Sequence, residues 1–501
     1  MVKMSLQDAS MLRVESPTTP MHIGFLLTFK LPPKAPRDFL QRLHEKMQRF
    51  AADSPPFNYR VAPAKSRTEL PQWEVVDHVD LEYHLRHEAL PAPGTERELG
   101  LVMSRLHSVP LDPSRPMWEF YFIEGLQGGR FGVYLKIHHS MADGMLLMER
   151  LPRTMANSPT GKSLPPWAVP PASGDDQPPI DDAGDAWRKW LQGLFKASRD
   201  KDKKKSGIPK GPRSLLNGSI SGRRRFATQT MDLNRVKALA KAAEATVNDV
   251  VMALCSGALR RFLDEFDSIP SESLVASIPV ALPRGKGEML SGNSVGGINT
   301  EIASHIADPR QRLEAIKQSM RDAKVELQQT PPAVSRTINA VGMYVMSLIP
   351  PGGSDRAPLT NLTISNVPGP KTAMYLDGAE MDGMYPASVL TGDHRVNITL
   401  VGYRDRLCFG IIGCQGVLNA SAGLIYPVSC RPTGVGAALG IGRIGSLSGP
   451  VVGGFIVAQH WPNQQLFFVP MLPLAMDSAL TQFRRLLDQR LEAEAGNAPP
   501  A

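Results

Sequence analysis

The stretch MWEFYFIEGLQGGRFGVYLKIHHSMADGM, residues 117–145, combines a hairpin pattern with a pair of histidines. Two runs rich in aromatic and β-branched residues flank a glycine-bearing turn at residues 127–129, which is typical of a β-hairpin. In the second run, apolar residues occupy every other position from Phe131 to Ile137, the period of a β-strand. The two histidines therefore lie where a strand ends, and a helix-like MLLMERLPRTM follows them.

The histidine pair has the chemistry of a proton-transfer site. An imidazole titrates near pH 6.5, so His138 or His139 can accept a proton at neutral pH and return it. Only one histidine is needed as the base, and the other can hold geometry. Asp143 could orient an imidazole, as in a triad, or pair with an arginine. Gly144 could allow a tight turn or a close approach of the backbone to a ligand.

Two other kinds of site are disfavoured at this motif. Adjacent residues at a strand end point to opposite faces, so chelation of one metal ion by both histidines is disfavoured, and no HExxH pattern accompanies them. We therefore expect no metal. The sequence has no GxSxG pattern, so a serine acyl-enzyme is not indicated.

The segment that contains this hairpin, residues 1–155, is expected to form one mixed α/β unit. MHIGFLLTFKL at 21–31 has the composition of a strand, and PRDFLQRLHEKMQRF at 36–50 has that of a helix. Together with the hairpin they give a first predicted domain of alternating strands and helices.

Residues 226–420 predict a second unit of the same class. Two helical patterns meet near residues 245–248, and a strand and a further helix are expected at 274–282 and 308–327. LTNLTISNVPGP at 359–370 is a strand that ends in a turn, and the segment at 394–414 is a second late hairpin. Two units of this kind predict a pseudo-duplicated α/β (α+β) fold.

Residues 156–225 are expected to be a proline-rich, basic linker that contains an amphipathic helix. Apolar residues at 187–195 follow helical spacing, and a lysine run at 201–205 follows them. This pattern suits a helix lying at a membrane or lipid-droplet surface. The alternative is a helix that packs against the protein body, followed by a solvated charge run.

Residues 421–501 form an atypical, glycine-rich tail. Overlapping GxxxG spacings between Gly436 and Gly453 are typical of closely packed membrane helices. The longest uncharged run is close to the roughly 20 residues that a bilayer requires, and it contains Pro450 and His460. The tail is therefore a candidate set of membrane-associated helices, closed by an amphipathic helix at 477–494.

Composition limits the partners and the compartment. A chain of 501 residues exceeds one hydrophobic core, so two domains are expected. A net charge of +8 favours anionic partners, but no recognition-helix signature or aromatic–basic stretch indicates nucleic acid. No secretory signal pattern is present. The few cysteines lack metal-binding spacing and fit a reducing compartment, so a cytoplasmic location is expected; they are Cys255, Cys408, Cys414 and Cys430.

HHSMADG fits HHxxxDG, and in this context the chain resembles the bacterial wax ester synthase/diacylglycerol acyltransferase family. The resemblance covers most of residues 1–420 and is carried by LQDASMLRVESPTTPMHIG (6–24), PLDPSRPMWEF (110–120), HHSMADG (138–144), the segment 223–263, TISNVPGP (363–370) and VNITLVGYRDRLCFGIIGC (396–414). Met117 stands where the family usually has leucine. In the tail, residues 424–476 resemble the last helices of a major facilitator transporter.

The resemblance implies two CoA-dependent-acyltransferase-like (chloramphenicol acetyltransferase-like) domains with a tunnel between them. It implies a fatty acyl-CoA substrate and a diacylglycerol or long-chain alcohol acceptor, without a separate cofactor. It assigns the base to His139 and support to Asp143. An Asn-Asp pair, Asn248-Asp249, matches an element that shapes the site, although Asn248 could instead be a helix N-cap.

Three further residues are candidates for substrate contact. Asn366 could hydrogen-bond across the tunnel or hold the turn before Pro368. For Arg115 and Trp118, a loop salt bridge and core packing are the favoured alternatives. The oxyanion donor is expected to be a backbone amide near Gly144 or the side chain of Asn248.

The expected activity is therefore acyl-CoA-dependent esterification, which makes triacylglycerol or wax esters at the inner membrane or at lipid droplets, with the tail as a candidate anchor. Two alternatives stay open. One is a condensation-type acyltransferase with an amine acceptor, which shares HHxxxDG. The other is a non-catalytic lipid-droplet or membrane-binding protein, based on residues 186–197 and the tail.

Overall fold

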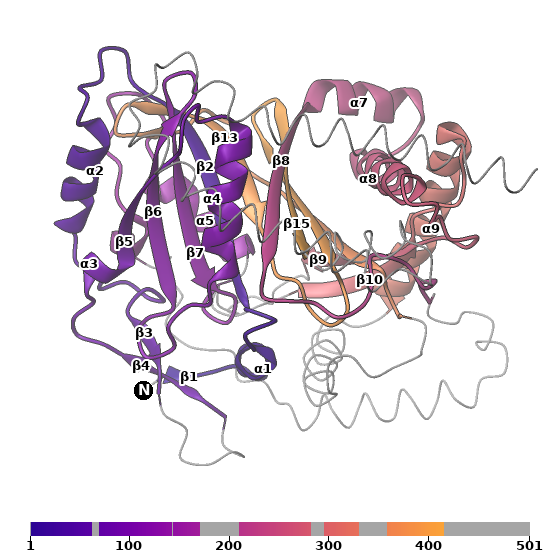
Figure 1. Cartoon of the computed structure of the whole chain (residues 1–501), viewed down its shortest axis with the longest axis horizontal. Helices are drawn as coiled ribbons and strands as arrows, with labels where there is room; N and C mark the ends of the chain where they lie inside the picture. Colours follow the sequence, from indigo (N-terminus) through magenta and orange to yellow (C-terminus); the bar gives the residue numbers. More distant parts are fainter. Residues whose placement is uncertain are drawn as a thin grey trace, which may run out of the picture. The chain divides into compact units, whose positions relative to one another are not determined.

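The computed structural model describes residues 2–62, 70–142, 144–170, 210–281, 295–329 and 358–414. Within these ranges most strands belong to two six-stranded sheets (Figure 1). A small third sheet has the order β1 (Val2–Lys3), β4 (Gln72–Val75), β3 (Tyr59–Val61).

The predicted hairpin forms the middle of the first sheet. Strand β7 (Arg130–His138) pairs antiparallel with β6 (Trp118–Leu126) across the turn and with β2 (His22–Lys30) on its other side, which confirms the strand expected at 21–31. The strand order is β12 (Tyr375–Leu376), β13 (Ala379–Ala387), β2 (His22–Lys30), β7 (Arg130–His138), β6 (Trp118–Leu126), β5 (Leu85–Ala89).

Both faces of β7 are buried, because helices pack on the two sides of this sheet. Tyr134 points toward α4 (Glu96–Ser108) and donates from its hydroxyl to His107 of that helix, whereas Leu135 points toward α5 (Gly144–Thr154). The helices of this region are α1 (Leu6–Val14), α2 (Phe39–Gln48), α3 (Leu81–His84), α4 (Glu96–Ser108), α5 (Gly144–Thr154) and the short η1 (Pro166–Ala168).

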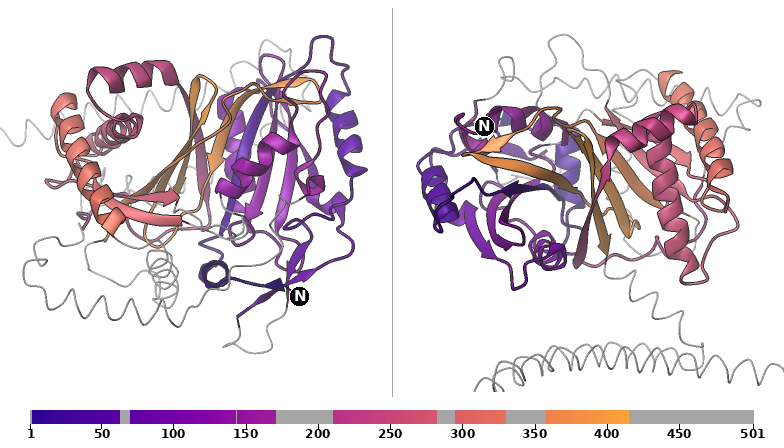
Figure 2. Two further views of the ribbon diagram at one scale, coloured as in Figure 1. Left: turned by 180° about the vertical axis from the view of Figure 1, so that it is seen from behind. Right: turned by 90° about the horizontal axis from the view of Figure 1, so that it is seen from above.

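The second sheet confirms the strands and the hairpin expected in the second half. Its order is β10 (Val295–Glu301), β9 (Val275–Ala281), β11 (Leu362–Val367), β14 (Val396–Tyr403), β15 (Arg406–Cys414), β8 (Arg224–Asp232). The helices that lie beside this sheet (Figure 2) match the predicted helical segments; they are α7 (Leu233–Ala242), α8 (Val247–Asp264) and α9 (Pro309–Gln329).

One pair of strands crosses between the two expected units. Residues 375–387, from the second half of the sequence, form β12 and β13 and extend the first sheet beside β2 (Figure 1). Strand β15 then lies against β13, and the added Cβ of an alanine at Gly410 would be 1.7 Å from the carbonyl oxygen of Pro386. The first sheet therefore contains strands from both expected units, 1–155 and 226–420.

The start of the expected linker is packed rather than extended. Ala156 bridges to Tyr375, and Trp167 is fully buried, with its ring stacked 5.3 Å from that of Trp118. The expected amphipathic helix and the tail lie outside the described residues, as does Cys430. The other three cysteines are buried, and no disulfide bond joins them to one another. No helix in the described ranges is long and apolar enough to cross a membrane.

Candidate active site

The two motif histidines lie at the end of β7 and are held in different ways. His138 is the last residue of the strand, pairs in register with His22 of β2, and has no exposed surface. His139 is half-buried and is held through its backbone, because its N–H donates to the carbonyl oxygen of Met21 at 2.8 Å. Only His139 of the pair therefore offers surface to a substrate.

His138 is held through Nδ1, and its Nε2 faces the carboxylate of Glu15. Nδ1 accepts the backbone N–H of Ser140 at 3.2 Å and lies 2.6 Å from the Ser140 hydroxyl. Because Nδ1 accepts that amide, the ring proton belongs on Nε2, which lies 3.4 Å from Oε2 of Glu15. This arrangement suits a histidine that positions its neighbour.

Glu15 connects three segments at this point, and sequence reasoning did not identify it. It follows α1, and its Oε1 accepts the backbone N–H of Met21 at 3.0 Å. Burial raises the pKa of Glu15, but hydrogen bonds and charge from His138, the Met21 amide and Lys136 outweigh that effect and lower it. The ionised carboxylate thus joins α1, the start of β2 and the motif.

Gly144 is the first residue of α5 and is not among the glycines with positive φ, so it begins a helix rather than a left-handed turn. An added Cβ at this position would contact Cγ2 of Val367, at the end of β11, at 3.9 Å. The motif therefore meets the second sheet at Val367. Asp143 lies outside the described residues.

The Asn-Asp pair lies at the same junction. The Nδ2 of Asn366, beside Val367, donates to the Oδ1 of Asn248 at 3.5 Å, a long and weak hydrogen bond. The N-cap alternative for Asn248 is wrong. Thr246 caps α8 and forms a capping box with Asp249, whose Oδ2 accepts the Thr246 amide at 2.8 Å. Asn248 is thereby left with its side chain toward Asn366.

Arg115 and Trp118 have structural partners. Arg115 pairs with Asp80 at 2.8 Å and lies over the ring of Tyr83. Trp118 is fully buried, stacks on His84 at a ring distance of 4.2 Å, and donates from its indole nitrogen to the carbonyl oxygen of Phe57. Arg115 therefore forms a loop salt bridge, and Trp118 packs in the core.

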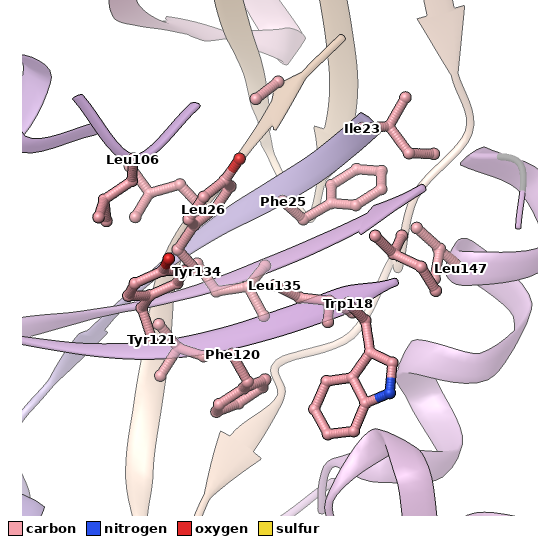
Figure 3. Packing of buried hydrophobic residues seen from close by; sticks show 14 of the residues in the cluster. Ile23, Phe25, Leu26, Leu106, Trp118, Phe120, Tyr121, Tyr134, Leu135 and Leu147 are labelled. Carbon is pink, nitrogen blue, oxygen red and sulfur yellow. The ribbon is translucent and has the colours of Figure 1, made fainter. Parts of the chain in front are cut away.

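An apolar pocket lies beside the motif, between α5 and the first sheet. Its cavity volume is about 40 Å³. Figure 3 shows Phe25 of β2, Leu135 of β7 and Leu147 of α5 on one side of the sheet, while Leu26 and Tyr134 lie on the other. The helix that lines this pocket begins with the motif glycine, Gly144.

Neutral histidines lie on the opposite side of the same sheet. His107 is buried; its Nδ1 accepts the hydroxyl of Tyr134 at 2.7 Å and its Nε2 donates to the carbonyl oxygen of Ser388 at 3.1 Å. Burial lowers the pKa of His107 to about 3. His22, whose Nε2 donates to the carbonyl oxygen of His107, also has a strongly lowered pKa because of burial.

Comparison with known proteins shows the family of the chain. A profile described as the wax ester synthase/diacylglycerol acyltransferase catalytic domain matches residues 4–251, and a profile of the C-terminal domain of the same family matches residues 291–426. The chain belongs to the wax ester synthase/diacylglycerol acyltransferase family.

Relatives of this family share most of their length with the chain. A Mycobacterium tuberculosis protein named as a diacylglycerol O-acyltransferase is 36% identical over 467 residues, which cover 82% of this chain and 92% of that protein. An Acinetobacter baylyi protein named O-acyltransferase WSD is 34% identical over 442 residues, which cover 83% of this chain and 93% of that protein. The chain is thus an acyltransferase, as predicted.

A solved wax ester synthase/diacylglycerol acyltransferase from Marinobacter aquaeolei VT8 superposes with a TM-score of 0.64 at 31% identity, covering 86% of this chain and 98% of that one. A condensation domain of the calcium-dependent antibiotic synthetase superposes with a TM-score of 0.51 at 16% identity and shares the fold alone. The predicted acyltransferase fold class is confirmed.

Proposed function

We propose that the chain transfers a fatty acyl group from acyl-CoA to a hydroxyl of diacylglycerol or of a long-chain alcohol, with His139 as the general base. The proposal rests on one observation: His139 is the half-buried histidine at the end of β7, where the motif meets the second sheet. The relatives named diacylglycerol O-acyltransferase and O-acyltransferase WSD support the acceptor class.

In this proposal the reaction needs no covalent enzyme intermediate and no separate cofactor. A ring nitrogen of His139 takes the proton of the acceptor hydroxyl as the oxygen attacks the thioester carbonyl carbon. The new C–O bond forms, the C–S bond breaks, and the proton passes to the departing CoA sulfur. General-base help of this kind contributes roughly 10²–10⁴-fold.

The negative charge on the carbonyl oxygen needs a donor nearby. The side chain of Asn248 and a backbone amide at the start of α5 are the two candidates, because both lie at the junction that contains Asn366 and Val367. In this scheme His138 and Glu15 position the base rather than exchange protons with substrate. We assign Asp143 a supporting role at the same motif.

The test is release of free CoA from palmitoyl-CoA with hexadecanol or diacylglycerol as acceptor. We expect His139→Ala to lower kcat by roughly 10²–10⁴-fold while the thermal unfolding temperature stays near that of the wild type. Normal turnover in the variant would show that another group is the base. Release of CoA with amine acceptors alone would favour the condensation-type reaction, and no release with any acceptor would favour a lipid-binding protein.

We further propose that the enzyme works in the cytoplasm at the surface of the inner membrane or of lipid droplets, where both fatty substrates gather. The support is the tryptophan- and lysine-rich sequence at 186–205, together with the glycine-rich tail. Deleting residues 186–205 should reduce flotation of the protein with anionic liposomes, and unchanged flotation would leave the tail as the remaining anchor.

A further inference from the structure

Strand β7 carries a lysine, Lys136, that has no exposed surface and that the proposed reaction does not use. Side chains two residues apart on a strand point to the same face, so Lys136 shares a face of β7 with His138. Across the sheet Lys136 pairs with Glu119 of β6 and with Gly24 of β2. A buried ammonium therefore lies close to the motif, on the side of its buried histidine.

The ammonium of Lys136 is held by Glu119, which is itself buried. Nζ of Lys136 donates to Oε2 of Glu119 at 3.0 Å, and the same oxygen accepts the hydroxyl of Tyr121 at 2.6 Å. The other carboxylate oxygen, Oε1, pairs with Nη2 of Arg86 at 3.2 Å. Because one carboxylate faces two cations, this cluster carries a net positive charge.

The carboxylate of Glu15 supplies the balancing negative charge. Burial alone would raise the pKa of Glu15, and the charge of Lys136 is one of the effects that lower it. Burial lowers the pKa of Lys136 itself, while Glu119 and Glu15 raise it. The charges alternate in sign along the row Arg86, Glu119, Lys136, Glu15, and the row ends at Nε2 of His138.

Packing of the sheet does not account for a buried ion pair at this position. An apolar pair of similar volume is often at least as stable, because burying two charges costs about as much as their attraction returns. The neighbouring histidines respond to Lys136 in the opposite sense to Glu15. Burial lowers the pKa of His22 and of His107, and the charge of Lys136 lowers both further. The ammonium thus favours an ionised carboxylate and neutral imidazoles around the motif.

We propose that Lys136 is a positioning residue for acyl transfer, and that its ammonium, held by Glu119, keeps the Glu15 carboxylate charged and in place at the motif. The inference rests on the proposed function and adds a residue that touches no substrate. Its effect passes from Glu15 to the ring of His138 and, through the backbone of Met21, to the amide of His139.

The experiment uses the full-length enzyme and changes the charge of the lysine. Lys136→Met keeps an unbranched side chain without the charge, whereas Lys136→Arg keeps the charge. Lys317→Met is the matched control, because Lys317 of α9 is also buried and donates to Glu314 and to the carbonyl oxygen of Ala243. Release of CoA is measured for each variant from pH 5 to pH 9.

We expect Lys136→Met to lower kcat roughly tenfold with little change in KM for acyl-CoA, because the base loses its orientation. The acid limb of the kcat profile should move to higher pH, since the ammonium no longer holds down the pKa of Glu15. Lys136→Arg and Lys317→Met should keep the limb at its wild-type position. A wild-type profile for Lys136→Met, or an equal shift in Lys136→Arg, would show that this charge has no role in the reaction.

A double variant covers the case in which Lys136→Met fails to fold because Glu119 is left buried with less compensation. Lys136→Met/Glu119→Gln removes both charges at nearly constant volume and should regain most of the thermal stability. Its kcat should stay roughly tenfold below the wild type, since Glu15 still lacks its opposing charge. Recovery of wild-type kcat together with stability would show that the ion pair serves the fold alone.

A double-mutant cycle with Glu15→Gln separates this inference from the proposed reaction. Because Lys136 acts through Glu15, Lys136→Met should change kcat by less than about twofold once Glu15→Gln is present. Urea denaturation of the same four proteins measures the coupling without turnover. Additive effects in both measurements, with CoA still released, would retain the reaction and overturn the role of Lys136. Coupling in the unfolding free energy without CoA release would support the charge arrangement and overturn the proposed reaction.

Discussion

The motif places the side chains of His138 and His139 in different surroundings. Glu15 faces the ring of His138, whereas it reaches His139 through the backbone of Met21. Its carboxylate faces the ring of His138 and accepts the amide of Met21. The carbonyl of that same Met21 accepts the amide of His139. The position of the proposed base thus depends on Glu15 through the backbone of Met21.

This dependence gives a prediction for Glu15 variants. Glu15→Ala leaves the buried amide of Met21 without its acceptor, so the free energy of unfolding should fall by about 1–3 kcal/mol. Loss of orientation should lower kcat roughly tenfold to a hundredfold, with little change in KM for acyl-CoA. Glu15→Gln, which keeps an acceptor oxygen, should recover part of the lost unfolding free energy and part of the lost kcat. Urea denaturation measures the first and steady-state kinetics the second.

The pH dependence of the same carboxylate follows from its lowered pKa. A folded-state pKa below the unfolded value gives stability that is present above the unfolded pKa and is lost as pH falls through the folded pKa. Glu15→Gln should remove this part of the acid sensitivity. Wild-type stability and kcat in Glu15→Ala would show that the carboxylate is dispensable.

At the level of single residues, the sequence identifies the proposed base, His139, but not Glu15, which positions it. The alternation in β7 is enough to place His138 and His139 at a strand end. Glu15 escapes detection because its contact with His138 depends on the register between β2 and β7, which no local pattern encodes. Asn248 was compatible with an N-cap, but Thr246, two residues earlier, forms the capping box with Asp249.

Among the elements, α4 packs on the first sheet through a histidine that has to stay neutral. His107 donates to a carbonyl and accepts from a hydroxyl, and both hydrogen bonds are available to the uncharged ring. Charging it would remove the acceptor nitrogen. Burial, with a smaller effect of the nearby charges of Lys136 and Arg224, lowers the pKa of His107 to about 3.

Stability should therefore fall in mild acid. The unfolded imidazole titrates near pH 6.5, so between pH 6.5 and about 3 the unfolded chain binds a proton that the folded chain does not. The contribution of His107 is fully present above pH 6.5 and is lost toward pH 3, at about 1.4 kcal/mol per pH unit. Urea denaturation at a series of pH values measures the slope.

His107→Gln is the matched change for this prediction. An amide can donate and accept but does not titrate here, so the slope between pH 4 and 6 should fall by about 1.4 kcal/mol per pH unit. His84, whose pKa burial lowers to about 4, keeps its own contribution. An unchanged slope would mean that His107 is not the responsible group.

Strong periodic patterns in the sequence were sufficient to predict most helices and strands. The hairpin β6–β7 and the helices α7, α8 and α9 fall where apolar spacing predicts them. Strand β13 lacks such a pattern, because its sequence AEMDGMYPA contains two acidic residues, a glycine and a proline. Its place is set by pairing with β2 and by the bulge between Met381 and Gly383.

At the scale of the whole described chain, the two sheets meet where β15 crosses β13. Gly410 allows this approach, since any Cβ would overlap the backbone of Pro386. We predict that Gly410→Ala forces the strands apart and lowers the free energy of unfolding by about 1–3 kcal/mol or more. Acyl transfer should fall with it, because the junction at Val367 depends on the same packing of the sheets.

Gly413→Ala on the same strand is the control for this prediction. An added Cβ there meets no atom within 4 Å, so the methyl group should be accepted without strain. Thermal unfolding and CoA release measure both variants. Equal behaviour of Gly410→Ala and Gly413→Ala would show that the crossing tolerates the extra atom.

The sequence predicted two α/β units of similar build but not the exchange of β12 and β13 between them. That exchange is a long-range pairing of residues more than three hundred positions apart, such as Gly24 with Ala387. Its energy comes from the completed sheet and not from local preference. The first domain predicted from sequence patterns therefore ends near residue 155, whereas its sheet is completed only by the strand that ends at residue 387.

This order of assembly has a consequence during synthesis on the ribosome. Until residues 379–387 have emerged, β2 is an exposed edge strand whose outward amide and carbonyl groups have no β-sheet partner. Such an edge can pair with a neighbouring nascent chain. A gene cut between the halves would yield an amino-terminal fragment that aggregates, and co-expression of the missing half should rescue its solubility.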